Sequence, residues 1–428
     1  MGRIIFAFSF IVVFILISSS CSKSVKDTET LVIWHWMTDR HDVFRQMAAK
    51  YESETGKKVY FELNAPSDLF TTKIRAAAQT NTLPDVYGIL GGSQDLANFI
   101  NSNLVLDLTP YLKANDNEWE KTLYSKALDT TAFKEINQWN VLPGYYGLPI
   151  DVANIQMIYN KKIFEEAGIS KIPETWEEFL QAGELITSKT NKKYFVSGFG
   201  ETWLINSMIR NFAFNIMGEN LFIDSIKGTY SYDSEKWISV FDKFRVMSEK
   251  KLFASGIVTM INKTAERLFS TENVAVTFNG SWSVNVYKGM NPSLKFGAMF
   301  FPKVSNDYPV VIQGGAGSSL VVIKTSSKKD DAIKFLKWIT SKENQIFLTR
   351  ETNNLPSNIN AVDEIPDILK EFSDDMDKTI HPSLLPVAED PSIEEAIARG
   401  VQSIIIGEMT PQELGKQLAD FKKKIMNE

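Results

Sequence analysis

The sequence predicts an α/β protein that folds as two lobes. About 400 residues remain after removal of an N-terminal signal segment. A single hydrophobic core rarely supports a chain of that length, so two lobes are expected. Strand and helix patterns alternate from Leu31 onward, which is typical of a parallel sheet covered by helices. The stretch from Gly147 to Glu178 predicts a chain crossing between the lobes, then a strand, a short helix stopped by glycine and a capped second helix.

Residues 1–20 are predicted to be a secretory signal peptide. Arg3 gives a basic start, and an apolar run from Ile4 to Ile17 leads into three serines. The apolar run is shorter than the ~20 residues that a membrane-spanning helix needs, which favours cleavage over an uncleaved anchor.

The chain contains a single cysteine, Cys21, so it can form no intrachain disulfide. Exported proteins usually carry cysteines in disulfide pairs, so an unpaired one suggests another role, and acylation of the thiol is the role we expect. Its position directly after small residues resembles the bacterial lipoprotein cleavage site, although Ser18 stands where that pattern usually has an aliphatic residue. We therefore predict a lipidated tether over residues 21–30 that holds a soluble chain at the membrane outside the cytoplasm. Plain signal cleavage that leaves an unimportant thiol is the alternative.

The composition argues against a nucleic-acid partner. The chain has 46 basic and 52 acidic residues, a formal charge of −6, and no Lys/Arg stripe that would follow a phosphate backbone. Nine tryptophans make large rings available for a binding cleft, although most such rings lie in cores.

The first elements predict a βαβ unit. The apolar run that begins at Leu31 is typical of a buried strand, and a second strand is expected from Val59. Between them, the apolar spacing over residues 42–51 predicts a helix, with Gly56 as its C-terminal stop. Short links between these elements predict parallel pairing of the two strands.

The alternation continues along the chain. Helices are predicted over 70–79 and 93–100, on either side of a strand that begins at Asp85. After the crossing, a strand begins at Ile155, and Thr175 and Glu178 have the spacing of a helix capping box. Four later strands and two helices are predicted: VAVTF from Val274, FGAMF from Phe296, VVI from Val310, LVVI from Leu320, 330–339 and 411–425.

Several segments carry a family resemblance through their order and spacing. They are LVIWHWMTDRHDVFRQMAAKYESETGKKVYFEL, KIRAAAQTNTLPDVYGI, LVLDLTPYL, the stretch from Gly147, VAVTFNGSW, GGAGSSLVVIKTSSKKDDAIKFLKWITSKENQIFL and TPQELGKQLADFKKKI. In this combination the sequence resembles the family 1 extracellular solute-binding proteins of bacterial ABC importers, the group that includes maltose-binding protein.

The resemblance implies a type II periplasmic-binding-protein-like fold with a ligand cleft between lobes joined by hinge crossings. The N-terminal lobe would comprise 31–150 plus 311–350, and the C-terminal lobe 151–310 plus 351–428. It also implies a monomeric carbohydrate-binding component, without enzyme activity or cofactor, that serves ABC permease subunits. Ligand sites between domains and closure about a hinge agree with this expectation.

The loop after the first strand is the first candidate site. The resemblance implies that Trp36, Thr38, Asp39 and Arg40 face the cleft. Neighbouring hydroxyls of a sugar are bound by side chains that offer two donors or two acceptors at once, and Arg40 and Asp39 are of this kind. The alternative is that they are solvated loop charges.

Tryptophans supply the second set of candidates. Trp282 follows a strand, where the resemblance implies an aromatic platform for a pyranose ring, and Asn279, three residues earlier, is expected to bind ligand as well. Trp203, with Glu201 beside it, lies in another segment that the resemblance assigns to the cleft. Burial in a core is the alternative for each tryptophan.

Glycines and one carboxylate complete the candidate set. Gly314 and Gly315 are expected just before a strand, where backbone approaches a ligand closely or makes a tight turn. Gly92 and Ser93 are expected to offer backbone amides at a helix start. Asp151, at the first crossing, is expected to bind ligand or support the hinge.

Three other functions remain open at this point. The three histidines have no metal-ligand spacing, and no phosphate-binding loop appears. A secreted glycoside hydrolase would also need rings and carboxylates, however. A sensory receptor lobe and a carrier of polyamines are further alternatives.

Overall fold

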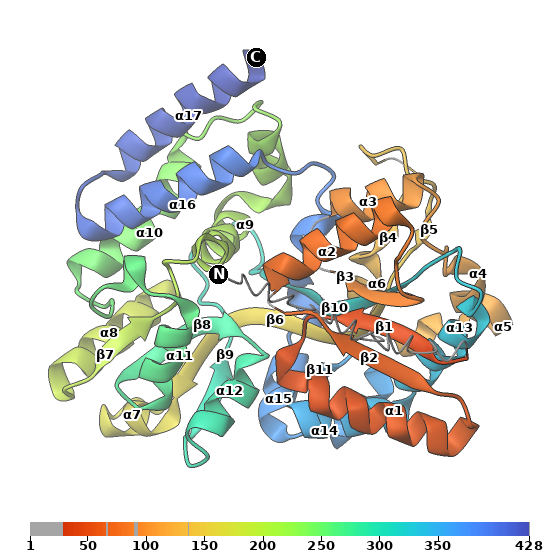
Figure 1. The fold of residues 1–428 in the computed structure, drawn as a ribbon. Coiled ribbons are helices and arrows are strands. Elements are labelled where there is room, and N and C mark those ends of the chain that lie inside the picture. The colour runs from red at the N-terminus through yellow and green to blue at the C-terminus, as the bar shows by residue number, and fades with distance from the viewer. Residues whose placement is uncertain (1–28, 66, 90–92, 136, 428) are drawn as a thin grey trace, which may run out of the picture.

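The computed structural model describes residues 29–65, 67–89, 93–135 and 137–427 of the chain (Figure 1). The predicted signal peptide, Cys21, most of the predicted tether and Gly92 lie outside these residues. The side chains of Asp39 and Ser93 also lie outside the description.

The predicted βαβ start is confirmed. Strand β1 (Leu31–His35) pairs in parallel with β2 (Val59–Leu63) and with β3 (Val86–Ile89). Helix α1 (His41–Thr55) joins the first two strands and ends at Gly56, whose φ of 70° is the left-handed conformation that glycine adopts without strain. Helices α2 (Ser67–Thr80) and α3 (Ser93–Asn101) flank β3 in sequence.

Two long antiparallel strands run through both halves of the molecule. They are β6 (Leu148–Asn160) and β10 (Ile312–Val322). β10 pairs with β3, whereas the far half of β6 pairs with β8 (Val274–Gly280) and β9 (Phe296–Met299). With β7 (Lys193–Val196) at its end, the sheet has the order β2-β1-β3-β10-β6-β8-β7. Figure 1 shows β6 reaching from one half of the molecule to the other.

The structure corrects the predicted place of the glycine run. The two strands predicted from Val310 and Leu320 are one strand, β10, so Gly314 and Gly315 lie inside a strand instead of before one. They pair with Asn154 and Ala153 of β6, so both glycines lie within the sheet. The register shifts between Ala316 and Ser319, and such an irregularity bends a strand.

Close packing explains the glycine at position 314. A Cβ there would lie 2.6 Å from Cγ2 of Thr379 and 2.9 Å from the carbonyl oxygen of Ala153. Gly315 has a φ of 150°. Both glycines are therefore explained by the packing and backbone conformation of the crossing strand β10.

The half built around β1, β2 and β3, here called the first lobe, contains several short elements beyond its sheet. They are α4 (Thr109–Leu112), α5 (Ala114–Asn117), α6 (Ser125–Asp129), β4 (Ala132–Phe133), β5 (Gly144–Tyr145), α13 (Lys329–Ile339) and α14 (Lys342–Thr352). Helix α14 continues through the predicted lobe boundary at residue 350.

The other half, here called the second lobe, is built around β7, β8 and β9. Its helices are α7 (Lys161–Glu166), α8 (Trp176–Lys189), α9 (Thr202–Ile226), α10 (Glu235–Glu249), α11 (Asn262–Ser270), α12 (Ser283–Met290), α16 (Pro391–Ile406) and α17 (Pro411–Asn427). The predicted capping box of α8 is confirmed, because the Glu178 amide donates to the Thr175 hydroxyl and the Glu178 carboxylate accepts from the Thr175 amide.

Two short strands from the chain between α14 and α16 pair with the crossing strands. β11 (Leu355–Pro356) pairs with β6 beside Asp151, and β12 (Thr379–Ile380) pairs with β10. The chain therefore returns to the junction after β6 and β10 have passed through it. Helix α15 (Asp367–Ser373) packs near β9.

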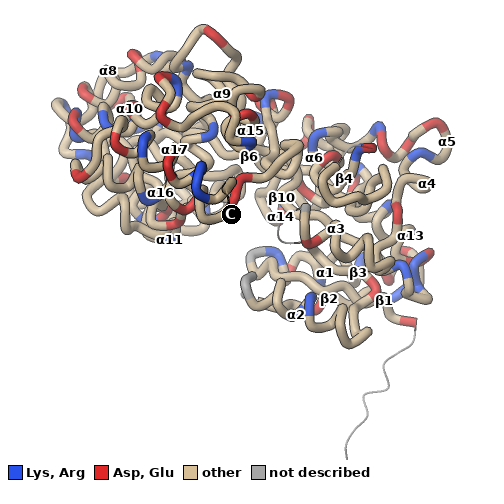
Figure 2. Tube along the Cα trace, turned by 90° about the horizontal axis from the view of Figure 1, so that it is seen from above, with Lys and Arg blue, Asp and Glu red and all other residues tan. Residues whose placement is uncertain are grey.

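Separate hydrophobic cores support the two lobes. The core of the first lobe includes Phe44, Phe61, Leu148, Leu320 and Phe335. That of the second lobe includes Phe179, Phe212, Trp237, Phe278 and Val401. Figure 2 shows the two masses meeting where β6 and β10 pass between them. The predicted two-lobed α/β fold with hinge crossings is confirmed.

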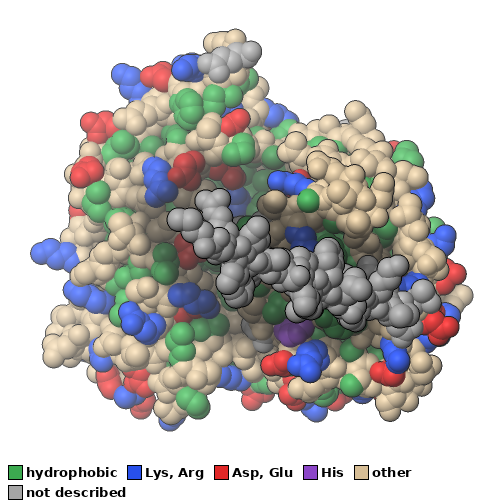
Figure 3. Space-filling view, viewed as in Figure 1, with side chains coloured by type: hydrophobic (Ala, Val, Ile, Leu, Met, Phe, Trp, Pro, Cys, Tyr) green, Lys and Arg blue, Asp and Glu red, His purple; other side chains and the backbone are tan. Residues whose placement is uncertain are grey.

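The surface carries charges of both signs. Figure 3 shows acidic and basic side chains interspersed over the face that it presents. Among the helices in the described ranges, none combines the length and apolar character needed to cross a membrane.

Candidate ligand-binding cleft

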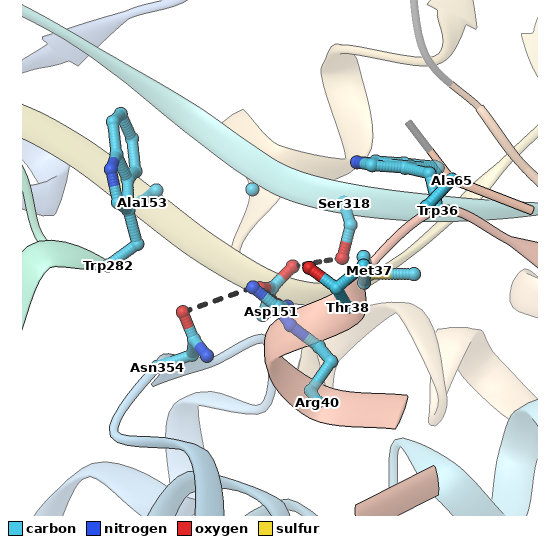
Figure 4. A pocket seen from close by; sticks show the side chains of 11 residues that line it. Trp36, Met37, Thr38, Arg40, Ala65, Asp151, Ala153, Trp282, Ser318 and Asn354 are labelled. Carbon is cyan, nitrogen blue, oxygen red and sulfur yellow. Dashed lines mark hydrogen bonds and ion pairs between the residues drawn. The ribbon is translucent and has the colours of Figure 1, made fainter. Parts of the chain in front are cut away.

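A cavity of about 580 Å³ lies where the two lobes and the crossing strands meet, a volume within the range of small-molecule sites. Loops after β1 and β8 reach it from opposite lobes, and β6 and β10 pass along it (Figure 4). Its wall is formed by Trp36, Met37, Thr38, Arg40, Ala65, Asp151, Ala153, Trp282, Gly317, Ser318 and Asn354.

The loop after β1 brings its residues to the first-lobe side of the cavity. The strand ends at His35, and a single 3-10 turn (Thr38–Arg40) leads into α1. The Trp36 ring packs on Phe70, with 5.5 Å between ring centroids. Gly88 of β3 makes room for it, since a Cβ there would lie 2.7 Å from Cζ3 of Trp36.

A buried ion pair lies at the base of the cavity. Arg40 pairs with Asp151 of β6, and the side chains of both residues are at least nine-tenths buried. Oδ1 of Asp151 accepts a hydrogen bond from the Ser318 hydroxyl at 2.5 Å, and Nη2 of Arg40 donates to Oδ1 of Asn354 at 3.3 Å. Buried charges need such partners because leaving water costs several kcal/mol for each ion. This cluster joins the first lobe to both crossing strands.

Glycine at position 317 leaves room for the Asp151 carboxylate. A Cβ at Gly317 would lie 3.0 Å from Oδ1 of Asp151, tighter than most real contacts. The register shift of β10 falls on either side of Ser318 and directs this part of the strand toward the carboxylate.

The loop after β8 supplies the opposite wall. The Trp282 ring folds back over Gly280, where a Cβ would lie only 2.1 Å from the ring atoms. In Figure 4, Trp282 and Trp36 lie at opposite sides of the cavity, with Arg40, Asp151 and Asn354 between them. Two apolar ring surfaces therefore flank a polar centre.

Trp203 extends the ring surface of the second lobe beyond the cavity wall. Its ring centroid is 6.0 Å from that of Trp282, and 40% of its surface is exposed. Its indole Nε1 donates to Oε2 of Glu201 at 2.9 Å. Neither Trp203 nor Glu201 lines the cavity.

The structure gives Asn279 a different position from the predicted one. Its side chain is fully buried, with Nδ2 3.4 Å from Oε1 of Glu266 and 3.3 Å from the Tyr287 hydroxyl. Its Oδ1 accepts from the Gly280 amide at 2.8 Å. Asn279 therefore lies under the Trp282 loop and away from the cavity wall.

A second polar contact joins the lobes beside the cavity. Nζ of Lys288, on α12, donates to Oδ1 of Asn353 at 3.2 Å. Burial lowers the pKa of Lys288 below its ordinary value. Asn353 has a left-handed φ of 49° at the end of α14, and this turn presents the following residue, Asn354, to the cavity.

Of the residues predicted from sequence, five lie together on the cavity wall: Trp36, Thr38, Arg40, Asp151 and Trp282. Glu201, Trp203, Asn279, Gly314 and Gly315 do not line it. Ala153 also lines the cavity, and its place there could have been predicted. It lies two residues after Asp151 on β6, so the two side chains share one face of the strand. Asn354 gave no local signal, since it arrives from a distant part of the chain.

The cavity has the makeup of a binding site for a small polar molecule with apolar faces. The described residues contain no group of three or more His, Cys, Asp or Glu side chains that could hold a metal ion. Together, the two lobes, the antiparallel crossing strands and the cavity between them define a type II binding-protein fold.

The chain belongs to the family of bacterial extracellular solute-binding proteins, whose model matches residues 36–346. It is 23% identical over 334 residues to a multiple sugar-binding protein from Streptococcus mutans, covering 76% of this chain and 74% of that one. It is 24% identical over 344 residues to a diacetylchitobiose binding protein from Streptomyces coelicolor, with 77% and 73% covered.

Solved structures are similar in fold. A chitin oligosaccharide binding protein superimposes with a TM-score of 0.74 at 20% sequence identity, covering 92% of this chain and 98% of that one.

Proposed function

We propose that this protein binds a sugar or oligosaccharide outside the cytoplasm and delivers it to the permease of an ABC importer. The observation that carries the proposal is the pair of rings, Trp36 and Trp282, on opposite sides of a cavity whose centre holds Arg40, Asp151 and Asn354. A pyranose has apolar C–H faces and a rim of hydroxyls, and this arrangement matches both.

Hinge closure is the proposed working motion. We propose a first lobe of 31–150 plus 311–350 and a second of 151–310 plus 351–428, moving about the crossing strands. A saccharide that touches both tryptophans gains contacts when the lobes close, so it favours the closed state. Reversible delivery suits a micromolar Kd, or about −8 kcal/mol.

The proposed setting is the outer side of the cytoplasmic membrane. Cleavage of residues 1–20 and acylation of Cys21 would tether a monomer there, and both lobes would present to permease subunits. Family membership supports an extracellular role. The names of relatives that bind sugars support the choice of ligand.

Bond cleavage is not part of the proposal. Among the described side chains that line the cavity, Asp151 is the one carboxylate, and it is engaged by Arg40 and by the Ser318 hydroxyl. Hydrolysis of a glycoside commonly needs two carboxyl groups flanking the scissile bond. The relatives are also named as binding proteins.

A thermal-shift screen of the mature chain against monosaccharides, oligosaccharides and polyamines tests the proposal. A ligand that binds only the folded state stabilises it by about 2.7 kcal/mol at a concentration of 100 Kd, so at least one saccharide is expected to raise the Tm. Mass spectrometry of the recovered saccharide is expected to find it intact. A screen in which polyamines alone raise the Tm, or a cleaved saccharide, would contradict the proposal.

A further inference from the structure

We propose that Glu201 is a positioning residue that holds Trp203 beside Trp282, so that the two rings form one rigid wall at the rim of the cleft. We call this pair of rings the aromatic wall. Its role in ligand binding rests on the proposed function, whereas the bracing itself is a property of the ligand-free protein.

The Glu201 carboxylate joins two separate segments. Its Oε2 accepts from the Trp203 indole at 2.9 Å, and its Oε1 accepts from the backbone amide of Asn262 at 2.7 Å. The first partner is on α9 and the second is the first residue of α11. An ionised carboxylate only accepts hydrogen bonds, so it can serve both donors at once.

The Glu201 side chain does not cap α9. The residue occupies the N-cap position of that helix, but its side chain makes no capping hydrogen bond. Its carboxylate is therefore directed to the indole and to α11. A substitution there removes no capping hydrogen bond from α9, whereas the Asn262 amide at the start of α11 loses its acceptor.

The two bridged segments touch backbone to backbone. A Cβ at Gly198 would lie 2.6 Å from Cα of Asn262, and one at Gly200 would lie 2.7 Å from the carbonyl carbon of Thr259. The Gly200 amide also donates to the Met260 carbonyl at 2.9 Å. Glycine at both positions lets the loop that carries Glu201 approach α11 closely enough for the carboxylate to reach.

Further contacts lead from α11 to the second ring. Nδ2 of Asn262 donates to Oε1 of Glu266 at 3.2 Å, and the same oxygen lies 3.4 Å from Nδ2 of Asn279. Glu266 is almost completely buried. Asn279 in turn fixes the Gly280 amide, directly before the loop that carries Trp282. Hydrogen bonds thus lead from the Trp203 indole, through Glu201, Asn262, Glu266 and Asn279, to the backbone just before Trp282.

Bracing of this kind matters because Trp203 is exposed. An indole with 40% of its surface in water would sample several rotamers if its N–H had no fixed acceptor. A ring already held in one orientation removes part of the ordering cost from the binding step.

The first experiment needs no ligand. Near-ultraviolet circular dichroism and acrylamide quenching are measured for the wild type, Glu201→Ala, Trp203→Phe and the double variant. Glu201→Ala is expected to change the tryptophan bands and to raise the quenching constant. The same substitution in the Trp203→Phe background, which lacks the indole N–H, is expected to change both signals much less, because only the Asn262 amide then loses its acceptor.

Equal changes in both backgrounds, or none in either, would overturn the proposal. Glu201→Gln is the second variant, because one amide oxygen cannot accept as a carboxylate does from two sides, and an intermediate change is expected. Glu235→Ala, an exposed glutamate at the start of α10, is the matched control and is expected to leave both signals unchanged.

The second experiment connects the brace to binding. With a saccharide identified by the thermal-shift screen, Glu201→Ala is expected to raise the Kd about threefold to tenfold, the scale of one aromatic contact. An unchanged Kd alongside the expected spectral change would overturn the binding role and keep the brace. If no saccharide binds, the proposed function fails while the first experiment still decides whether Glu201 holds Trp203.

Discussion

Replacing Trp282 with alanine is expected to raise the Kd for a bound saccharide roughly 30- to 150-fold, equivalent to about 2–3 kcal/mol. The ring forms the second-lobe wall of the cavity, and Gly280 beneath it leaves the space that the ring occupies. Alanine would remove the apolar surface and leave a gap that only water could fill. Isothermal titration calorimetry of both proteins with the same saccharide measures the change.

The control for this prediction is Trp338→Ala. Trp338 is another half-buried tryptophan, on α13 of the first lobe, and it packs on Tyr51 outside the cavity wall. Its loss is expected to lower the Tm with little effect on the Kd. Equal losses of affinity in the two variants, or none in Trp282→Ala, would remove Trp282 from the site.

Replacing Asp151 with alanine is expected to lower the free energy of unfolding by about 3–5 kcal/mol, because the buried charge of Arg40 would lose its opposite carboxylate. The Ser318 hydroxyl would lose its acceptor as well. Urea unfolding followed by circular dichroism measures the difference. The additional substitution Arg40→Met, which removes the buried charge, is expected to restore much of the lost stability.

An exposed ion pair provides the comparison. The side chains of Lys121 and Asp116 are 61% and 93% exposed. Pairs of this kind contribute little, so Lys121→Ala is expected to change stability by less than ~1 kcal/mol. If Asp151→Ala destabilises the protein no more than Lys121→Ala, the buried cluster is not what fastens the first lobe to the crossing strands.

Local signals in the sequence predicted much of the fold. Gly56 ends α1 and the Thr175–Glu178 capping box begins α8, as their residue types indicate. The division of β10 into two strands was wrong, because a run of three glycines in four residues is typical of a break. Pairing with β6 through that run is a tertiary effect that no local pattern encodes.

The site was predictable where its residues directly follow strands. Trp36 and Trp282 come soon after β1 and β8, at strand ends where loops reach a cleft. Asn279 was expected at the cleft as part of the segment that carries the resemblance, and no local pattern indicates that its side chain is buried beside Glu266 and Tyr287. Asn354 reaches the cavity from a turn that packs across the lobes, and its position depends on the folded arrangement of α14 and β11.

The central claim is that a saccharide binds between the two lobes, and a crystal structure of the complex with a saccharide from the thermal-shift screen tests it most directly. The account predicts a sugar ring stacked on Trp282, hydroxyls within hydrogen-bonding distance of the Arg40–Asp151 cluster, and Trp36 on the opposite side. A saccharide bound elsewhere on the protein, with this cavity holding only water, would contradict it.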